Sequence, residues 1–176
     1  YLQIGMGFGP LESGLRAAPW TMVPMVVAPE AGVLVKRNGP RTVLLIGMML
    51  QTTAVGCFVL LAHTSSGYGF YVLPMLIAGT GMGLTFSPLA TAVLEGIASQ
   101  DRAVVSGVNQ TARQLGTATG IALCTALFTT FGAYASGERF TAGLVPALGA
   151  CTVLLVAATA LVIVMPRSRL QPAGQQ

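Results

Sequence analysis

The chain has 176 residues and a formal net charge of +4, and 53% of its residues are hydrophobic while only 8% are charged. Its mean hydropathy is +0.74, whereas soluble domains are about 25% charged. This composition excludes an ordinary soluble domain. Two long segments, 42–94 and 140–166, contain no Lys, Arg, Asp or Glu, which predicts an all-α integral membrane protein.

Five apolar segments are long enough to cross a hydrocarbon core as helices, which takes about 20 residues each. They cover residues 11–34, 42–62, 70–94, 104–131 and 141–165, and a polar cytoplasmic tail is expected at 166–176. Helices are expected rather than barrel strands, because the apolar runs lack strand alternation and every backbone group in lipid must be satisfied internally. The first segment is the least regular, since it contains Arg16, Glu30 and three prolines.

Cations fall unequally on the two sides of the predicted membrane. If the loop VKRNGPR is cytoplasmic, the cytoplasmic side holds Lys36, Arg37, Arg41, Arg102, Arg167 and Arg169, against Arg16 and Arg139 outside. This bias fits the positive-inside rule and predicts a multi-pass protein of a cell membrane, with its start outside. The basic pI then follows from topology, so no nucleic-acid partner is expected.

No grouping of side chains favours catalysis or a bound cofactor. The cysteines Cys57, Cys124 and Cys151 lie singly in three apolar segments, without a CxxC motif or a nearby His, so small buried side chains are expected rather than zinc ligands or a disulfide. The word GTGMGL resembles a dinucleotide-binding loop but lacks the preceding strand and the later acidic residue. There is no Ser/His/Asp grouping or buried carboxylate pair. We expect no enzyme activity, no cofactor and no metal site.

The segment 104–131 carries one charge in an apolar run, Arg113. A helical wheel places one arc of small and polar residues opposite Val108 and Leu115, and the arc contains Ser106, Asn109, Gln110, Arg113, Thr117, Gly120 and Cys124. A charge at membrane depth is costly unless it faces a partner or a water-filled cavity. Arg113, Asn109, Gln110 and Thr117 are therefore candidates to line a substrate cavity. The alternative is that Arg113 only ties helices together or reaches toward the interface.

Glycines recur at a spacing that lets helix backbones approach closely. The pairs are Gly79 with Gly83 and Gly116 with Gly120. We interpret all four as helix-packing residues.

Methionine and aromatic residues offer a weaker signal for an apolar ligand pocket. Met82 and Phe86, together with Met75 and Trp20, are candidates to line it, because the Met side chain adapts its shape easily. Such residues are also common in helix cores and on lipid-facing surfaces. Both interpretations stay open.

Three stretches together resemble the C-terminal part of the major facilitator superfamily, and within it the branch of fourteen-span drug:proton antiporters. They are YLQIGMGFGPLESGLRAAPWTMVPMVVAPEAGVLVKRNGPR, AGTGMGLTFSPLATAVLEG and SGVNQTARQLGTATGIAL. The resemblance covers nearly the whole chain and implies the last five of fourteen spans. Because the chain also begins at Tyr1 rather than methionine, we expect a fragment of a larger transporter that lacks its N-terminal half.

The loop after the first segment resembles the cytoplasmic gate motif of this family. Gly32, Arg37, Gly39 and Arg41 match the motif as they stand here. Lys36 departs from it, because the family usually has Asp at that place. The charge relay that Asp would form is therefore not expected in this chain.

The resemblance implies export of amphipathic drugs or toxic compounds by proton antiport and alternating access, an activity associated with antibiotic resistance. The implied partners are the lipid bilayer, the N-terminal half of the same transporter, a small amphipathic substrate and protons. The acidic proton-coupling residue of the family and its companion arginine belong to that N-terminal half. The alternatives are an exporter dedicated to one host metabolite or antibiotic, and a membrane remnant that transports nothing.

Overall fold

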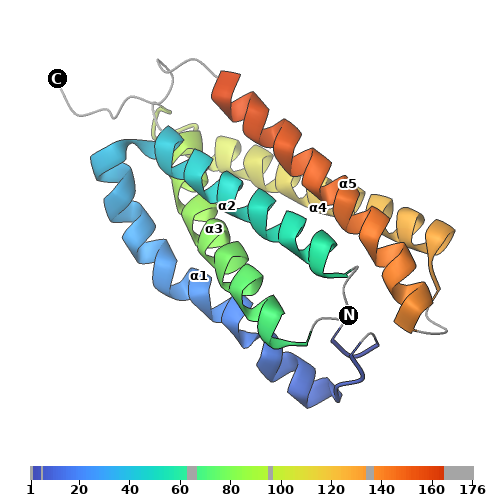
Figure 1. Cartoon of the computed structure of the whole chain (residues 1–176). Coiled ribbons are helices and arrows are strands. Elements are labelled where there is room, and N and C mark those ends of the chain that lie inside the picture. The colour runs from blue at the N-terminus through green and yellow to red at the C-terminus, as the bar shows by residue number, and fades with distance from the viewer. Residues whose placement is uncertain (1, 5, 63–66, 95–96, 134–136, 165–176) are drawn as a thin grey trace.

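The computed structural model describes residues 2–4, 6–62, 67–94, 97–133 and 137–164. These residues form α1 (Pro10–Asn38), α2 (Pro40–Ala62), α3 (Gly69–Leu94), α4 (Arg102–Phe131) and α5 (Gly137–Val164). All five helices contain a stretch long and apolar enough to cross a membrane, and Figure 1 shows them packed as a helical bundle. The predicted fold class is confirmed. Met165 and the predicted tail at 166–176 lie outside the described residues.

A single residue, Gly39, joins α1 to α2. Its φ of 79° lies in the left-handed region that favours glycine, and its N–H donates to the backbone oxygen of Val35 at 2.9 Å. The sequence predicts a loop over VKRNGPR, but α1 continues to Asn38. The physical reason is that Lys36 and Arg37 stand in the last turn of α1, where positive side chains are favoured by the helix dipole.

Glycines on opposite faces of α3 place it between α1 and α2. A Cβ on Gly79 would lie 2.9 Å from the backbone oxygen of Trp20 in α1, and Gly83 also lies against α1. A Cβ on Gly81 would instead lie 2.7 Å from the backbone oxygen of Gly47 in α2. Residues two apart on a helix point about 200° apart. The sequence GTGMG therefore opens one face of α3 to α1 and the opposite face to α2.

Polar and apolar contacts complete this three-helix unit. Gln51 Nε2 on α2 donates a hydrogen bond to Thr85 Oγ1 on α3 at 3.0 Å. Near the α1–α2 turn, Ala31, Val43 and Leu84 are buried together, one from each of the three helices. These contacts make α1, α2 and α3 the best-packed part of the described chain.

The helices α4 and α5 form an antiparallel pair that is tight at one end. A Cβ on Gly143 would lie 2.8 Å from the Cα of Gly132, and the rings of Phe128 and Phe140 meet edge to face with centroids 5.1 Å apart. α5 also packs against α2 (Figure 1). Most of α4 is exposed, and Phe128 is its one buried residue in the described structure.

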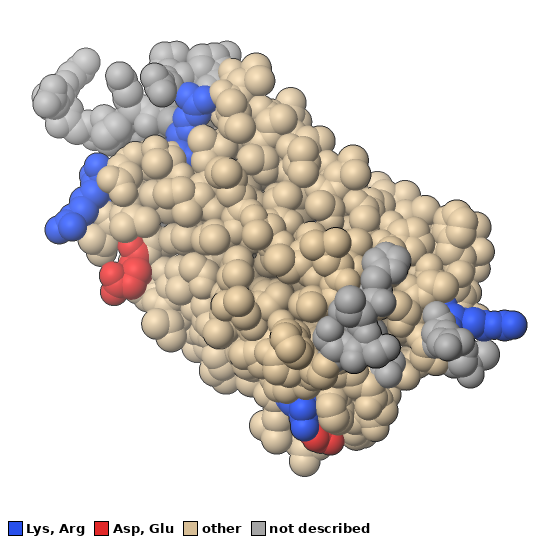
Figure 2. Space-filling model, viewed as in Figure 1, with Lys and Arg blue, Asp and Glu red and all other residues tan. Residues whose placement is uncertain are grey.

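Apart from Arg113, most charged side chains lie toward the ends of the helices, and Figure 2 shows a broad uncharged surface between them. Arg41 at the start of α2 donates a hydrogen bond to the backbone oxygen of Ile163 near the end of α5. At the opposite end of α1, Arg16 and Glu12 form an ion pair with a distance of 2.7 Å. An uncharged middle between charged ends is the arrangement that a bilayer requires.

Candidate functional site

Arg113 lies near the middle of α4 and contacts an aromatic ring of α3. Its side chain is exposed, and its Cζ atom lies 5.3 Å from the ring centroid of Phe86. Within about 6 Å such a contact is an attractive cation–π interaction. Met82 is half-buried one turn before Phe86 on α3, which places it on the same side of that helix. The structure thus joins Arg113 and Phe86, two of the predicted cavity residues, across two helices.

The remaining polar candidates of α4 lie within about one turn of Arg113. Asn109 is half-buried and Gln110 is exposed. Thr117 donates its hydroxyl to the backbone oxygen of Arg113 at 2.9 Å, so this hydroxyl serves the helix itself. The amides of Asn109 and Gln110 and the guanidinium of Arg113 form a polar patch on a helix that is otherwise largely apolar. We name these three residues the polar patch of α4.

The polar patch lies on the side of α4 that faces α3 and α5. Cys124 stands further along the same helix than Arg113, and the rotation between them is three full turns plus about 20°. The two side chains therefore point in nearly the same direction. Cys124 contacts Cys151 of α5 with 3.2 Å between the Sγ atoms, while Arg113 reaches Phe86 of α3. The patch therefore points toward the rest of the bundle.

Open space runs beside the polar patch. A Cβ on Gly116 or Gly120 would meet no atom within 4 Å among the described residues. These two glycines therefore do not pack against another helix among the described residues, and their role in helix packing stays a prediction. Gly79 and Gly83, by contrast, lie against α1.

The four residues of the predicted gate motif lie around the α1–α2 turn and have different surroundings. Arg41 Nη2 donates to the backbone oxygen of Ile163, and its Nε is buried without a hydrogen-bond partner in the part of the chain that the structure describes. Arg37 is exposed. Gly39 has the positive φ described above, whereas a Cβ on Gly32 would meet open space. The structure therefore explains the glycine at Gly39 but not the one at Gly32.

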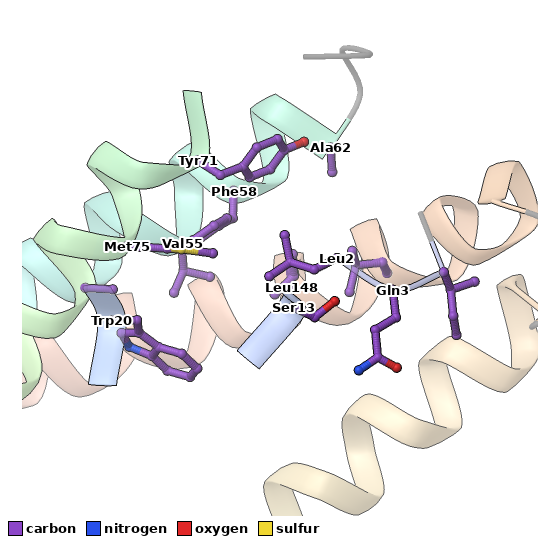
Figure 3. Close-up of a pocket in the computed structure, with 13 residues that line it drawn as sticks. Leu2, Gln3, Ser13, Trp20, Val55, Phe58, Ala62, Tyr71, Met75 and Leu148 are labelled. Carbon is purple, nitrogen blue, oxygen red and sulfur yellow. The ribbon is translucent and has the colours of Figure 1, made fainter. Parts of the chain in front are cut away.

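A separate apolar cavity of about 530 Å³ lies among α1, α2, α3 and α5. It is lined by Leu2, Gln3, Ile4, Ser13, Trp20, Val55, Phe58, Ala62, Tyr71, Met75, Ala78, Leu144 and Leu148. Figure 3 shows Phe58, Tyr71 and Met75 close together on one side, and the rings of Phe58 and Tyr71 are stacked with centroids 6.1 Å apart. Its size is typical of small-molecule pockets, about 300–1,000 Å³. No described residue of α4 lines it.

The sequence identifies this cavity only in part. Trp20 and Met75 line it as one interpretation expects, but Met82 and Phe86 do not. Phe58 and Tyr71 were missed, although Phe58 stands near the end of α2 and Tyr71 near the start of α3. An aromatic residue near the end of one predicted helix and another near the start of the next is the signal that could have found them.

Residues 1–121 match the family model for the Major Facilitator Superfamily. An uncharacterized transporter of Escherichia coli (strain K12) is 30% identical over 169 residues, which cover 96% of this chain and 36% of that protein. A multidrug resistance protein B homolog of Mycobacterium tuberculosis (strain ATCC 25618 / H37Rv) is 31% identical over 131 residues, or 73% of this chain and 24% of that protein. The tetracenomycin C resistance and export protein of Streptomyces glaucescens is 29% identical over 123 residues, or 70% of this chain and 23% of that protein.

These matches agree with one another and with the five apolar helices. The family match extends over most of the chain, and the Escherichia coli relative is similar along almost all of it. The chain spans only 36% or less of the length of these relatives. The chain belongs to the Major Facilitator Superfamily.

Proposed function

We propose that this chain is the C-terminal part of a bacterial cell-membrane transporter that exports amphipathic drugs or toxic compounds in exchange for protons. Three observations support the proposal. The chain belongs to a transporter family, a relative over 73% of the chain is named a multidrug resistance protein, and the relatives are much longer than the chain. Transport by alternating access requires two parts that move about a shared site, and this chain supplies one of them.

The polar patch of α4 is the observation that carries the proposal. Its guanidinium and amides provide hydrogen-bond donors and acceptors beside open space, and Phe86 provides an aromatic surface in contact with Arg113. A helix exposed to lipid alone would not carry a central arginine, because such a charge is expensive in hydrocarbon. A substrate with apolar and polar parts would find partners for both in this region.

Proton coupling requires a titratable group that this chain does not supply in its described apolar core. Among the described residues, the carboxylates are Glu12, Glu30, Asp101 and Glu138, the last at the start of α5. Glu12 is paired with Arg16 near the start of α1, and Asp101 precedes α4. Glu30 is exposed in the last third of α1. We therefore expect the coupling carboxylate in the N-terminal half of the transporter.

A second candidate function is an exporter dedicated to one host metabolite or antibiotic. The similarity to a protein named for tetracenomycin C resistance and export favours this alternative. The third possibility is a membrane remnant that transports nothing. The three possibilities differ in how many compounds the full-length protein moves.

The full-length transporter in proteoliposomes, with an imposed proton gradient, tests the proposal against both alternatives. We expect export of several chemically unrelated amphipathic compounds and its loss when a protonophore collapses the gradient. Export of one compound alone would favour the dedicated exporter, and no export of any compound would favour the remnant. Vesicles that contain only this chain are the control and should show no flux above empty vesicles.

The proposed orientation places the α1–α2 turn in the cytoplasm. Asn38 ends α1, Gly67 precedes α3, and both residues are exposed. Because α2 runs between them, the proposed topology places them on opposite sides of the membrane. In intact cells, a cysteine at Gly67 should react with an impermeant maleimide added outside, and a cysteine at Asn38 should react only after the membrane is opened. The reverse pattern would overturn the orientation.

A further inference from the structure

Two of the three cysteines are in contact, although they lie far apart in the sequence. The Sγ atoms of Cys124 on α4 and Cys151 on α5 are 3.2 Å apart, and both residues are half-buried. Cys57 on α2 is also half-buried and has no thiol partner among the described residues. The sequence predicts small side chains without a disulfide, and all three thiols are free; the contact corrects only the expectation that each cysteine stands alone.

The backbone register of α4 and α5 explains why these two thiols meet. Gly132 and Gly143 touch at the tight end of the pair. Cys124 lies just over two turns before Gly132, and Cys151 lies just over two turns after Gly143. The two helices are antiparallel, and each cysteine is equally far along its helix from the Gly132–Gly143 contact. Cys124 and Cys151 therefore lie opposite each other. Cys124 also points its Sγ at the backbone oxygen of Ala147, 4.0 Å away. The register of the two helices therefore places these two residues opposite each other.

We propose that Cys124 and Cys151 are an oxidisable dithiol, whose disulfide would tie α4 covalently to α5 within the membrane. The sulfurs must approach by only about 1.2 Å to reach the disulfide bond length. Small rotations of the two side chains supply that movement. This inference is independent of the substrate and of the proposed function.

The oxidation needs a neutral two-electron oxidant that enters the membrane, such as a peroxide or a diazene. One thiolate adds to the diazene nitrogen, and the second thiolate attacks the sulfur of that adduct. A sulfur–sulfur bond forms, both S–H bonds break, and the two electrons and two protons convert the diazene to a hydrazine. A reducing dithiol reverses the reaction by exchange.

The position of the pair gives this tie a structural consequence. On one side of Cys124, α4 is packed against α5 at Phe128 and Gly132. On the other side, Gly120 has no atom within 4 Å of its Cβ position among the described residues. The dithiol thus lies between the tightly packed end of the helix pair and the open position at Gly120. A disulfide would fix α4 at that point.

A cleavage assay on the full-length transporter in native membranes tests the inference. A protease site is inserted in the α4–α5 connection after Gly132, the membranes are treated with diamide, and remaining thiols are blocked. After cleavage, the two fragments should stay joined on a non-reducing gel and separate after reduction. The Cys57→Ser variant is the matched control and should behave like the unaltered protein.

Serine and alanine variants at each member of the pair complete the test. Cys124→Ser and Cys151→Ser, and the corresponding alanine variants, should give separate fragments without reduction. Separate fragments from the unaltered protein after both diamide and copper–phenanthroline would overturn the inference. A link that persists in the Cys124 variants would also overturn it, because another thiol would then be the partner of Cys151.

Discussion

The three-helix unit α1–α3 and the helix α4 share a glycine spacing but use it differently. Cβ atoms on Gly79 and Gly83 would lie 2.9 Å from atoms of α1, whereas Gly116 and Gly120 meet no atom within 4 Å in the described structure. The spacing permits close approach, but a complementary helix must be present for packing to occur. The comparison divides the described chain into a tightly packed unit and a helix whose middle is open.

The difference also separates structural residues from candidate functional ones. Glycines and the Gln51–Thr85 hydrogen bond hold the packed unit together. The central charge of the chain stands in the middle of α4, where Arg113 is exposed. Tight packing resists substitution, whereas an open polar surface is available to a ligand.

The largest expected effect comes from adding one methyl group inside the packed unit. In Gly47→Ala the new Cβ would lie 2.7 Å from Thr85 Oγ1 and 2.9 Å from the backbone oxygen of Gly81. We expect a loss of about 3 kcal/mol in unfolding free energy, because the backbone of α3 cannot give way. Gly56→Ala on the same helix is the control, since its Cβ would meet open space among the described residues. Denaturation of the full-length protein in detergent by SDS measures both, and equal stabilities would contradict the account.

A smaller effect is expected from a direct comparison of the two glycine pairs. Gly79→Ala would press against Trp20 and Val23 of α1 and should lower the unfolding free energy by about 1–2 kcal/mol. Gly116→Ala should change it by less than about 0.5 kcal/mol, because a cavity has room for one methyl group. The same SDS denaturation applies. If Gly116→Ala were the more harmful change, the proposed N-terminal half would pack against α4 and the cavity interpretation would fail.

The interhelical hydrogen bond of the packed unit should contribute less than either glycine contact. Thr85→Val removes the hydroxyl that accepts from Gln51 Nε2 at 3.0 Å. We expect a loss of about 1 kcal/mol, the usual magnitude for polar contacts between membrane helices. Thr53→Val is the control, because that hydroxyl donates only to Met49 within α2. Indistinguishable unfolding midpoints for the two variants would show that the Gln51–Thr85 bond contributes nothing.

The sequence predicts the five helices because each apolar run must satisfy its own backbone in lipid. It also identifies Gly79 and Gly83, but it cannot say which helix meets them. Gly116 and Gly120 have the same spacing, and only the structure shows that no atom lies within 4 Å of their Cβ positions among the described residues. The local sequence pattern therefore predicts the helices, whereas the contacts between helices must come from the structure.

The candidate site shows the same limit. The charge of Arg113 in an apolar run marks it from sequence alone, because charge at membrane depth needs a reason. Its contact with Phe86 and the meeting of Cys124 with Cys151 join residues of different helices. Such contacts depend on how helices cross, which no single segment encodes.

The central claim is that the polar patch of α4 serves transport and not the stability of the bundle. Export per folded molecule in the full-length transporter with Arg113→Ala tests this claim most directly, with abundance measured on the same membranes. Arg113→Lys should restore only part of the flux, because an ammonium lacks the guanidinium fork. Arg102→Ala at the start of the same helix is the control, since Arg102 Nε donates only to the nearby backbone oxygen of Ile97 at 3.2 Å. We predict unchanged abundance for Arg113→Ala and a loss of about tenfold or more in flux, as expected for one lost charge-assisted contact. Normal flux per molecule with reduced abundance would contradict the account.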